Sequence, residues 1–158
     1  MADIFPVGSG VTRLRGLMKI MRDHQGSVSL SHLAEETGKL VDELLPLVGV
    51  SELLGFARIE NGVLVLTDLG RQFPPGNPLP VIRSRLALVE PFKSAVFILN
   101  GRSMSTDELA AELKAKGVEF QESGTEHRLL KEVLVKWGVR TKLIAYDLEA
   151  DRWSLPSQ

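Results

Sequence analysis

Three histidines, His24, His32 and His127, are the only imidazole groups in the sequence. A transition-metal site usually shows itself as histidine, cysteine or carboxylate residues at short, regular spacings. These histidines share no such spacing with one another or with paired acids. His24 follows Asp23 at the expected end of a helix, where a cationic group is favourable without any metal. We therefore predict no metal site.

The acidic and nucleophilic residues form no catalytic constellation. Glu35–Glu36 and Asp42–Glu43 are adjacent pairs. Neighbours on a helix point about 100° apart, so neither pair can act as a carboxylate dyad. The chain has no cysteine, which excludes disulfides, thiol catalysis and cysteine-ligated zinc. It also lacks the G-x-S-x-G nucleophile elbow. We predict that the protein is not an enzyme and uses no cofactor.

The sequence also lacks a phosphate-binding loop. Such a loop requires G-x-x-x-x-G-K-[ST], in which backbone N–H groups surround the phosphates and the lysine neutralises them. The only Gly-Lys pair is Gly38-Lys39, which is followed by Leu40, and Leu33 stands where the first glycine is required. We predict that this chain does not hydrolyse ATP by itself.

A basic cluster lies near the C-terminal end of the chain, with five cations in fifteen residues. Its members are Arg128, Lys131, Lys136, Arg140 and Lys142. Glu126 and Glu132 dilute its charge, and the acidic segment Asp147–Asp151 follows it. A phosphate backbone would repel that segment. Three interpretations stay open for the cluster: a solvated face, a contact for a protein partner, or a surface that contacts phosphates.

Length and composition are ordinary for a soluble protein. The 158 residues are 44% hydrophobic and 25% charged, with a formal net charge of −1. This length fits one domain or two small ones, and a charge near zero provides no global attraction to nucleic acid. No apolar run approaches the roughly 18 residues of a membrane span, and no signal peptide is recognisable. We predict a cytoplasmic location and no direct membrane insertion.

The first half of the chain shows the order helix, short strand, helix, helix, hairpin, which is typical of a winged-helix module. After a lead-in of residues 1–10, apolar spacings of three and four predict a helix that ends near Gly26. A short strand follows, and then a helix capped by Ser31 that ends at Gly38. The third helix covers residues 41–55, with Asp42 as its cap.

A β-hairpin completes this module, which covers residues 11–73. Two alternating runs, 56–60 and 63–66, flank Asn61-Gly62, the strongest short signal for a two-residue hairpin turn. Thr67 can cap a final helical turn. As a DNA-binding module it would be poor, because the third helix offers acids in place of base-reading residues and Arg58 in the hairpin is opposed by Glu60.

The third helix is apolar around more than half of its circumference, which indicates burial on several sides. Leu47, Val50 and Leu54 widen its apolar stripe beyond one face. These three residues are candidates for a contact between modules or between two copies of the chain. An intramolecular core is the alternative.

A linker at residues 74–80, rich in proline and glycine, separates a second module at residues 81–158. This module opens with a long helix or a helix pair, in which Pro91 marks a kink or a restart. The next helix starts at Ser105 or Thr106. A third helix, over residues 123–138, presents an apolar face of Leu130, Val133, Leu134 and Trp137. Two strands, about 142–147 and 152–155, then form a hairpin.

Three segments resemble the C-terminal AAA-associated domain, which typically follows the ATPase domain of ABC importers of the nitrate, sulfonate and taurine type. They are PVGSGVTRLRGLMKIM, LAEETGKLVDELLPLVGVSELLGFARIENGVLVLTDLGRQF and KWGVRTKLIAYDLEADRWSL. The middle segment carries most of the specificity, and the resemblance extends from about Pro6 to Leu155. It implies a non-catalytic accessory or regulatory module. Because the sequence opens at Met1, where that domain would start, we expect it to act with a separate ATPase subunit.

We therefore predict a mainly helical α+β protein, a tandem of two winged-helix-like modules that acts through protein contacts. The basic cluster could then meet an acidic surface of an ABC ATPase subunit. The alternative function is a winged-helix transcriptional regulator that binds DNA through the second module. Self-association through the third helix also stays open.

Overall fold

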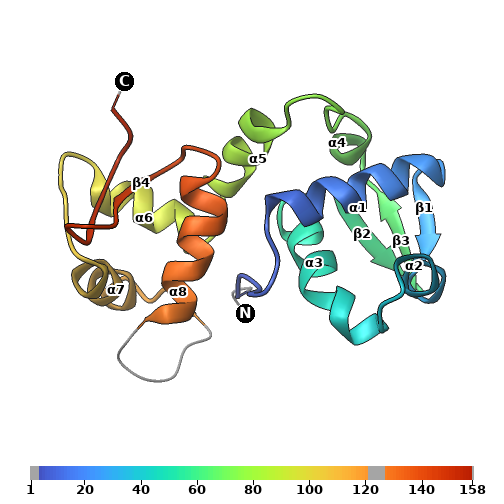
Figure 1. Ribbon diagram of the computed structural model, residues 1–158, viewed down its shortest axis with the longest axis horizontal. Coiled ribbons are helices and arrows are strands. Elements are labelled where there is room, and N and C mark those ends of the chain that lie inside the picture. Colours follow the sequence, from blue (N-terminus) through green and yellow to red (C-terminus); the bar gives the residue numbers. More distant parts are fainter. Residues whose placement is uncertain (1–3, 121–126, 158) are drawn as a thin grey trace. The chain divides into compact units, whose positions relative to one another are not determined.

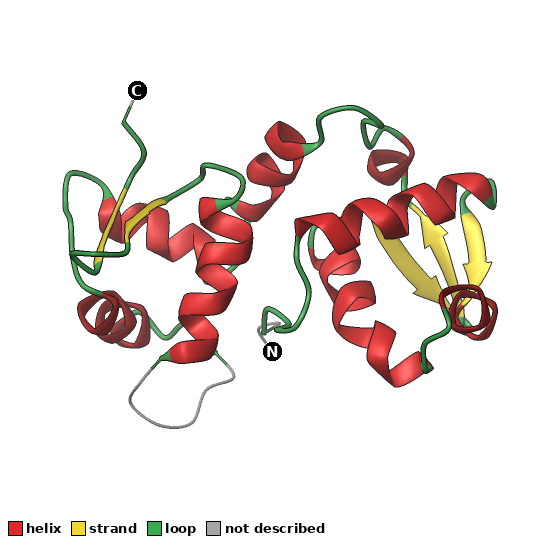
Figure 2. Cartoon of the chain, in the orientation of Figure 1, coloured by secondary structure: helices red, strands yellow, loops and turns green. Residues whose placement is uncertain are grey.

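The computed structural model describes residues 4–120 and 127–157, and it divides into two compact units. The first unit is Gly8–Pro78, and the second unit combines Met1–Val7 with Leu79–Gln158. Helices dominate both, with small antiparallel sheets beside them, so the predicted mainly helical α+β class is confirmed (Figure 2). Within the described residues, no helix combines the length and the apolar character needed to cross a membrane.

The first unit contains four helices and three strands among its described residues (Figure 1). They are α1 (Val11–Asp23), β1 (Ser27–Ser29), α2 (Leu30–Thr37), α3 (Val41–Leu53), β2 (Ala57–Glu60), β3 (Val63–Leu66) and α4 (Asp68–Arg71). The strands form an antiparallel sheet in the order β1-β3-β2. This is the predicted order of elements.

The hairpin turn and the helix α4 follow the sequence pattern. Asn61 and Gly62 have φ of 52° and 78°, the pair of positive angles that a type I′ turn requires. The Thr67 hydroxyl accepts a hydrogen bond from the Gly70 N–H at 3.0 Å and caps α4. The predicted end of α2 at Gly38 is also found, and this glycine adopts the left-handed conformation with φ of 70°.

Two predicted helix caps are wrong. The hydroxyl of Ser29, not that of Ser31, accepts from the His32 N–H at 3.1 Å and caps α2, because the helix starts directly after β1. Asp42 does not cap α3. Instead, the Glu43 carboxylate accepts from the backbone N–H of Leu40 at 3.0 Å.

One face of α1 closes the core of the first unit. Its buried residues recur every three or four positions: Val11, Leu14, Leu17, Met18 and Met21. The same side of the sheet contributes Val28, Leu64 and Leu66. The end of the unit is tied to the outer side of α1, since Arg22 donates to the Phe73 carbonyl at 2.6 Å and Arg15 to the Gly76 carbonyl at 2.7 Å.

The second unit also consists of helices followed by a hairpin. Its elements are α5 (Leu79–Leu86), α6 (Phe92–Leu99), α7 (Thr106–Ala115), α8 (Arg128–Val133), a π-helical segment η1 (Leu134–Val139), β4 (Ala145–Asp147) and β5 (Arg152–Ser154). Of the two predicted alternatives, a long helix or a helix pair, the structure has the pair, and its second helix starts after Pro91. Of the predicted third helix, residues 123–126 lie outside the described residues, and its second half is π-helical, which the sequence pattern did not indicate.

The two units share part of their topology. In the second unit, Met104 forms an isolated antiparallel bridge with Trp153 of β5, as β1 pairs with β3 in the first unit. The residue after this bridge, Ser105, caps α7 through the Glu108 N–H, as Ser29 at the end of β1 caps α2. Both units therefore contain a helix, a segment paired with the last strand, two helical segments and a hairpin, and the second unit has α5 in addition.

An aromatic cluster joins the start of the chain to the second unit. Phe5 is 1% exposed and packs edge-on against Phe92 and Trp137, with ring centroids 5.1 and 5.7 Å apart. The sequence pattern marks residues 1–10 only as a lead-in and indicates no packing role for them. The periodicity of the sequence cannot reveal one, because a single buried aromatic residue in a short irregular segment has no period.

Gly70 lies where any side chain would meet the backbone. A Cβ atom at this position would collide with the carbonyl oxygen of Phe56, whereas a Cβ at Gly16 in α1 would meet no atom within 4 Å. We expect Gly70→Ala to lower the free energy of unfolding by at least about 2 kcal/mol. Gly16→Ala should raise it by about 0.5–1 kcal/mol, because alanine is the better helix former. Urea unfolding of both variants tests this contrast; equal effects would contradict it.

Asp151 ties the hairpin of the second unit to the start of α7. One of its carboxylate oxygens accepts from the Thr106 hydroxyl at 2.6 Å and from the Tyr146 hydroxyl at 2.7 Å. The Trp153 indole N–H in turn donates to the Thr106 hydroxyl at 2.8 Å. The bonds from Thr106 and then Tyr146 lower the pKa of Asp151 below its ordinary value, against a smaller opposing effect of burial.

This network makes stability depend on pH. Because the pKa of Asp151 is lowered in the folded state, its contribution is full above the ordinary value of 3.8 and is lost as pH falls through the folded-state pKa. We expect Asp151→Asn to destabilise the protein at pH 7 by on the order of 1 kcal/mol. Asparagine tolerates the left-handed backbone here (φ 49°), so the substitution isolates the charge. In urea unfolding the difference from wild type should shrink at acid pH; a difference independent of pH would contradict this assignment.

Candidate functional site

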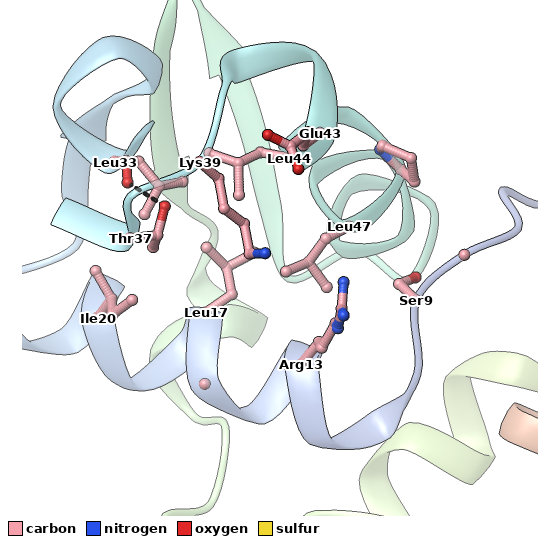
Figure 3. Close-up of a pocket in the computed structure, with 13 residues that line it drawn as sticks. Ser9, Arg13, Leu17, Ile20, Leu33, Thr37, Lys39, Glu43, Leu44 and Leu47 are labelled. Atoms are coloured by element: carbon pink, nitrogen blue, oxygen red, sulfur yellow. Dashed lines mark hydrogen bonds between the residues drawn. The ribbon is translucent and has the colours of Figure 1, made fainter. Parts of the chain in front are cut away.

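A groove in the first unit is a candidate binding site (Figure 3). It has a volume of about 240 Å³ and lies between α1, the end of α2 and the start of α3. Leucine and isoleucine side chains form its walls: Leu17, Ile20, Leu33, Leu44 and Leu47. Its volume is below the roughly 300–1,000 Å³ of pockets for drug-sized ligands. The groove therefore suits a small molecule or one or two side chains of a partner.

The rim of the groove carries two cations. Figure 3 shows Lys39 reaching from the loop between α2 and α3 toward α1, where Arg13 lies across the groove with Leu47 between them. Neither cation has a hydrogen bond or ion pair with any residue that the structure describes. Glu43 also lines the groove, but its carboxylate is held by the Leu40 N–H. Two cations above an apolar wall favour an anionic group attached to an apolar one.

A polar atom lies at one end of the same groove. Ser9, which lines the groove, is only 4% exposed, and its hydroxyl has no hydrogen-bond partner among the described residues. Buried hydroxyl groups normally have such a partner, and a missing one costs about 1–3 kcal/mol. A ligand that reached this end of the groove could supply it.

The predicted basic cluster is spread along α8, η1 and the turn after them. Arg128, Lys136, Arg140 and Lys142 are exposed. Two of the five cations are engaged locally. The Lys131 ammonium lies 5.1 Å from the ring centroid of Tyr146, and Lys136 forms an ion pair with Glu132 at 3.1 Å. The predicted apolar face opposite them is buried; its members are Leu130, Val133, Leu134 and Trp137.

The three apolar candidates, two on α3 and Leu54 at its C-terminal cap, differ in burial. Val50 and Leu54 are fully buried in the chain, whereas Leu47 is half-buried in the groove. A side chain that is buried in one chain presents no surface to a second copy. Of the three, only Leu47 is available for contact with another molecule.

The hairpin of the first unit has little free charge for a nucleic acid. Arg58 forms a hydrogen-bonded ion pair with Glu60 at 2.6 Å, which raises the pKa of the arginine. Asp42 and Glu43, at the start of α3, are both exposed. Carboxylates at that position would meet DNA phosphates with repulsion.

The structure corrects the prediction that the histidines share no ligand spacing. His24, His32 and Glu36 each offer a ligand atom, and these atoms lie within 4.8 Å of one another. His32 and Glu36 are four residues apart on α2, a spacing that was readable in the sequence. His24, at the end of α1, joins them only through the fold, in which its ring contacts His32 and Glu36. His127 lies elsewhere, 3.8 Å from Asp107.

Comparison with known proteins gives one match. The family model of the C-terminal AAA-associated domain matches residues 31–147, most of the chain and parts of both units. No curated protein and no solved structure matches it.

The groove leads to a binding prediction. Benzoate combines a carboxylate with a small apolar ring, so we expect it to shift the amide NMR signals of Leu17, Lys39 and Leu47. Arg13→Ala together with Lys39→Ala should weaken this binding by roughly three- to tenfold, as expected for partly exposed charges. Arg58→Ala, an exposed cation outside the groove, is the control. Equal loss in the control, or shifts spread over the whole unit, would contradict a specific site.

Proposed function

Because the chain belongs to the C-terminal AAA-associated domain family, we propose that it is a non-catalytic accessory module that binds and regulates an ABC-type ATPase of an anion importer. The family match carries this proposal. It is supported by the sequence, which has no phosphate-binding loop, since Leu40 follows the only Gly-Lys pair. The ATPase would then carry out ATP hydrolysis, and this chain would contribute binding energy to the complex.

We place the main contact at the groove of the first unit. Leu40 directly follows the groove residue Lys39 in sequence and is 71% exposed, so it offers a further apolar side chain to a partner. Interfaces depend on a few anchor side chains that fill a pocket and are surrounded by weaker contacts. An apolar side chain of the ATPase would fill the groove, and an acidic residue next to it would contact Arg13 and Lys39.

The second candidate function is DNA binding through the basic cluster. Arg128, Arg140 and Lys142 support it, since each is exposed and none has an ion pair within the described residues. The acidic hairpin and the pairing of Lys136 with Glu132 oppose it. We also propose that both units have a winged-helix architecture, on the basis of their shared order of elements.

Direct binding tests the groove as the contact. The purified chain should bind the ABC ATPase subunit of its own organism in isothermal titration calorimetry. Leu47→Asp with Lys39→Glu should weaken this binding at least tenfold, because it removes both the apolar wall and one cation. Arg140→Glu changes an exposed cation outside the groove and should leave binding within about twofold. Binding that survives the groove variant would contradict this contact, and no binding by the wild type would contradict the function.

Salt dependence separates the two functions. Fluorescence anisotropy with a labelled DNA duplex should show only weak binding at about 50 mM salt and none at about 200 mM. Tight binding at low salt that is lost in the variant Arg128→Ala with Lys131→Ala would favour the regulator instead. The calorimetric titration with the ATPase does not depend on the DNA measurement. Either proposed function can therefore be contradicted without affecting the test of the other.

A further inference from the structure

A histidine–carboxylate cluster lies at the junction of α1 and α2, outside the groove walls. The Nε2 atom of His24, the residue that ends α1, lies 3.1 Å from both carboxylate oxygens of Glu36. The His24 and His32 rings meet edge to face, with centroids 5.2 Å apart. The side chains come from two helices, and their three ligand atoms lie within 4.8 Å of one another.

We propose that His24, His32 and Glu36 form a binding site for a divalent transition-metal ion of the zinc type. Two imidazole nitrogens and one carboxylate oxygen are a ligand set that zinc accepts, at distances of about 2.0–2.2 Å. Imidazole ligands select zinc, nickel or copper over magnesium and calcium, which prefer oxygen ligands only. Three protein ligands leave one position of a tetrahedral ion for water or another group.

The geometry allows the three groups to converge on one ion. His32 and Glu36 project from the same face of α2, because they are one helical turn apart. The side chains of His24 and Glu36 are 28% and 41% exposed, so small rotations can bring the ligand atoms closer without disturbing the core. The ion would replace the direct contact between His24 and Glu36 and be bound by both.

The position also favours a cation over an anion. His24 lies at the C-terminal end of α1, where the helix dipole presents partial negative charge. Asp23 and Glu35, which are exposed, neighbour the ligands in sequence and add negative charge. A bound ion would tie the end of α1 to the middle of α2, two elements that are otherwise joined through the strand β1.

Metal titration of the full chain tests this site. Co²⁺, a spectroscopic stand-in for Zn²⁺, should bind with one equivalent and give visible absorption bands of a low-coordinate ion, and added Zn²⁺ should displace it. Because His32 and Glu36 are exposed, His32→Gln and Glu36→Gln should fold normally by circular dichroism. Each should lower Zn²⁺ affinity at least tenfold in calorimetry and abolish the rise in melting temperature that Zn²⁺ gives the wild type.

His127→Gln is the matched control, since His127 also lies near an acid, at 3.8 Å from Asp107, but has no second imidazole beside it among the described residues. It should bind Zn²⁺ as the wild type does. Wild-type affinity in His32→Gln, or an equal loss in His127→Gln, would show only non-specific surface binding and overturn the proposal. Absence of a stoichiometric Co²⁺ spectrum in the wild type would overturn it as well.

Discussion

Each unit depends on an antiparallel backbone pairing. It joins a short segment between two helices to the final strand of the hairpin. In the first unit β1 pairs with β3, and in the second Met104 bridges Trp153. Buried backbone groups need hydrogen-bond partners, so this pairing fixes where the segment can lie. The serine at its end then caps the next helix in both units. The positions of α2 and of the groove beside it therefore follow from a few backbone hydrogen bonds.

Local sequence signals predicted most of this fold. The Asn61-Gly62 turn, the Thr67 cap and the apolar stripe of α1 are set by neighbouring residues, and the sequence displays them. Features that arise from packing between distant segments were missed. Ser29 caps α2 because β1 pairs with β3, and Phe5 is buried because it returns to Phe92 and Trp137. The π-helical segment at Leu134–Val139 also has no signature in the apolar pattern.

The candidate sites show that cations close together in sequence need not all be free to contact a partner in the fold. The basic cluster was a candidate because its cations are close in sequence. In the fold, however, Lys131 lies over the Tyr146 ring and Lys136 forms an ion pair with Glu132. Arg13 and Lys39 are distant in sequence and were not singled out. The fold brings them to opposite sides of one groove, without partners among the described residues. The histidine–carboxylate cluster likewise depends on the fold, which places His24 at the end of α1 beside His32 and Glu36 of α2.

The aromatic cluster around Phe5 has a consequence for the energetics of the whole chain. Since Phe5 belongs to the second unit, that unit is completed only by closing a loop that contains all of Gly8–Pro78. Loop-closure entropy rises slowly with length, by about 0.6 kcal/mol for each doubling. When the first unit is folded, it acts as a compact insert; when it unfolds, it becomes a flexible loop between Phe5 and Leu79. The stabilities of the two units are thus linked through chain connectivity itself, by an entropic coupling that requires no contact between them.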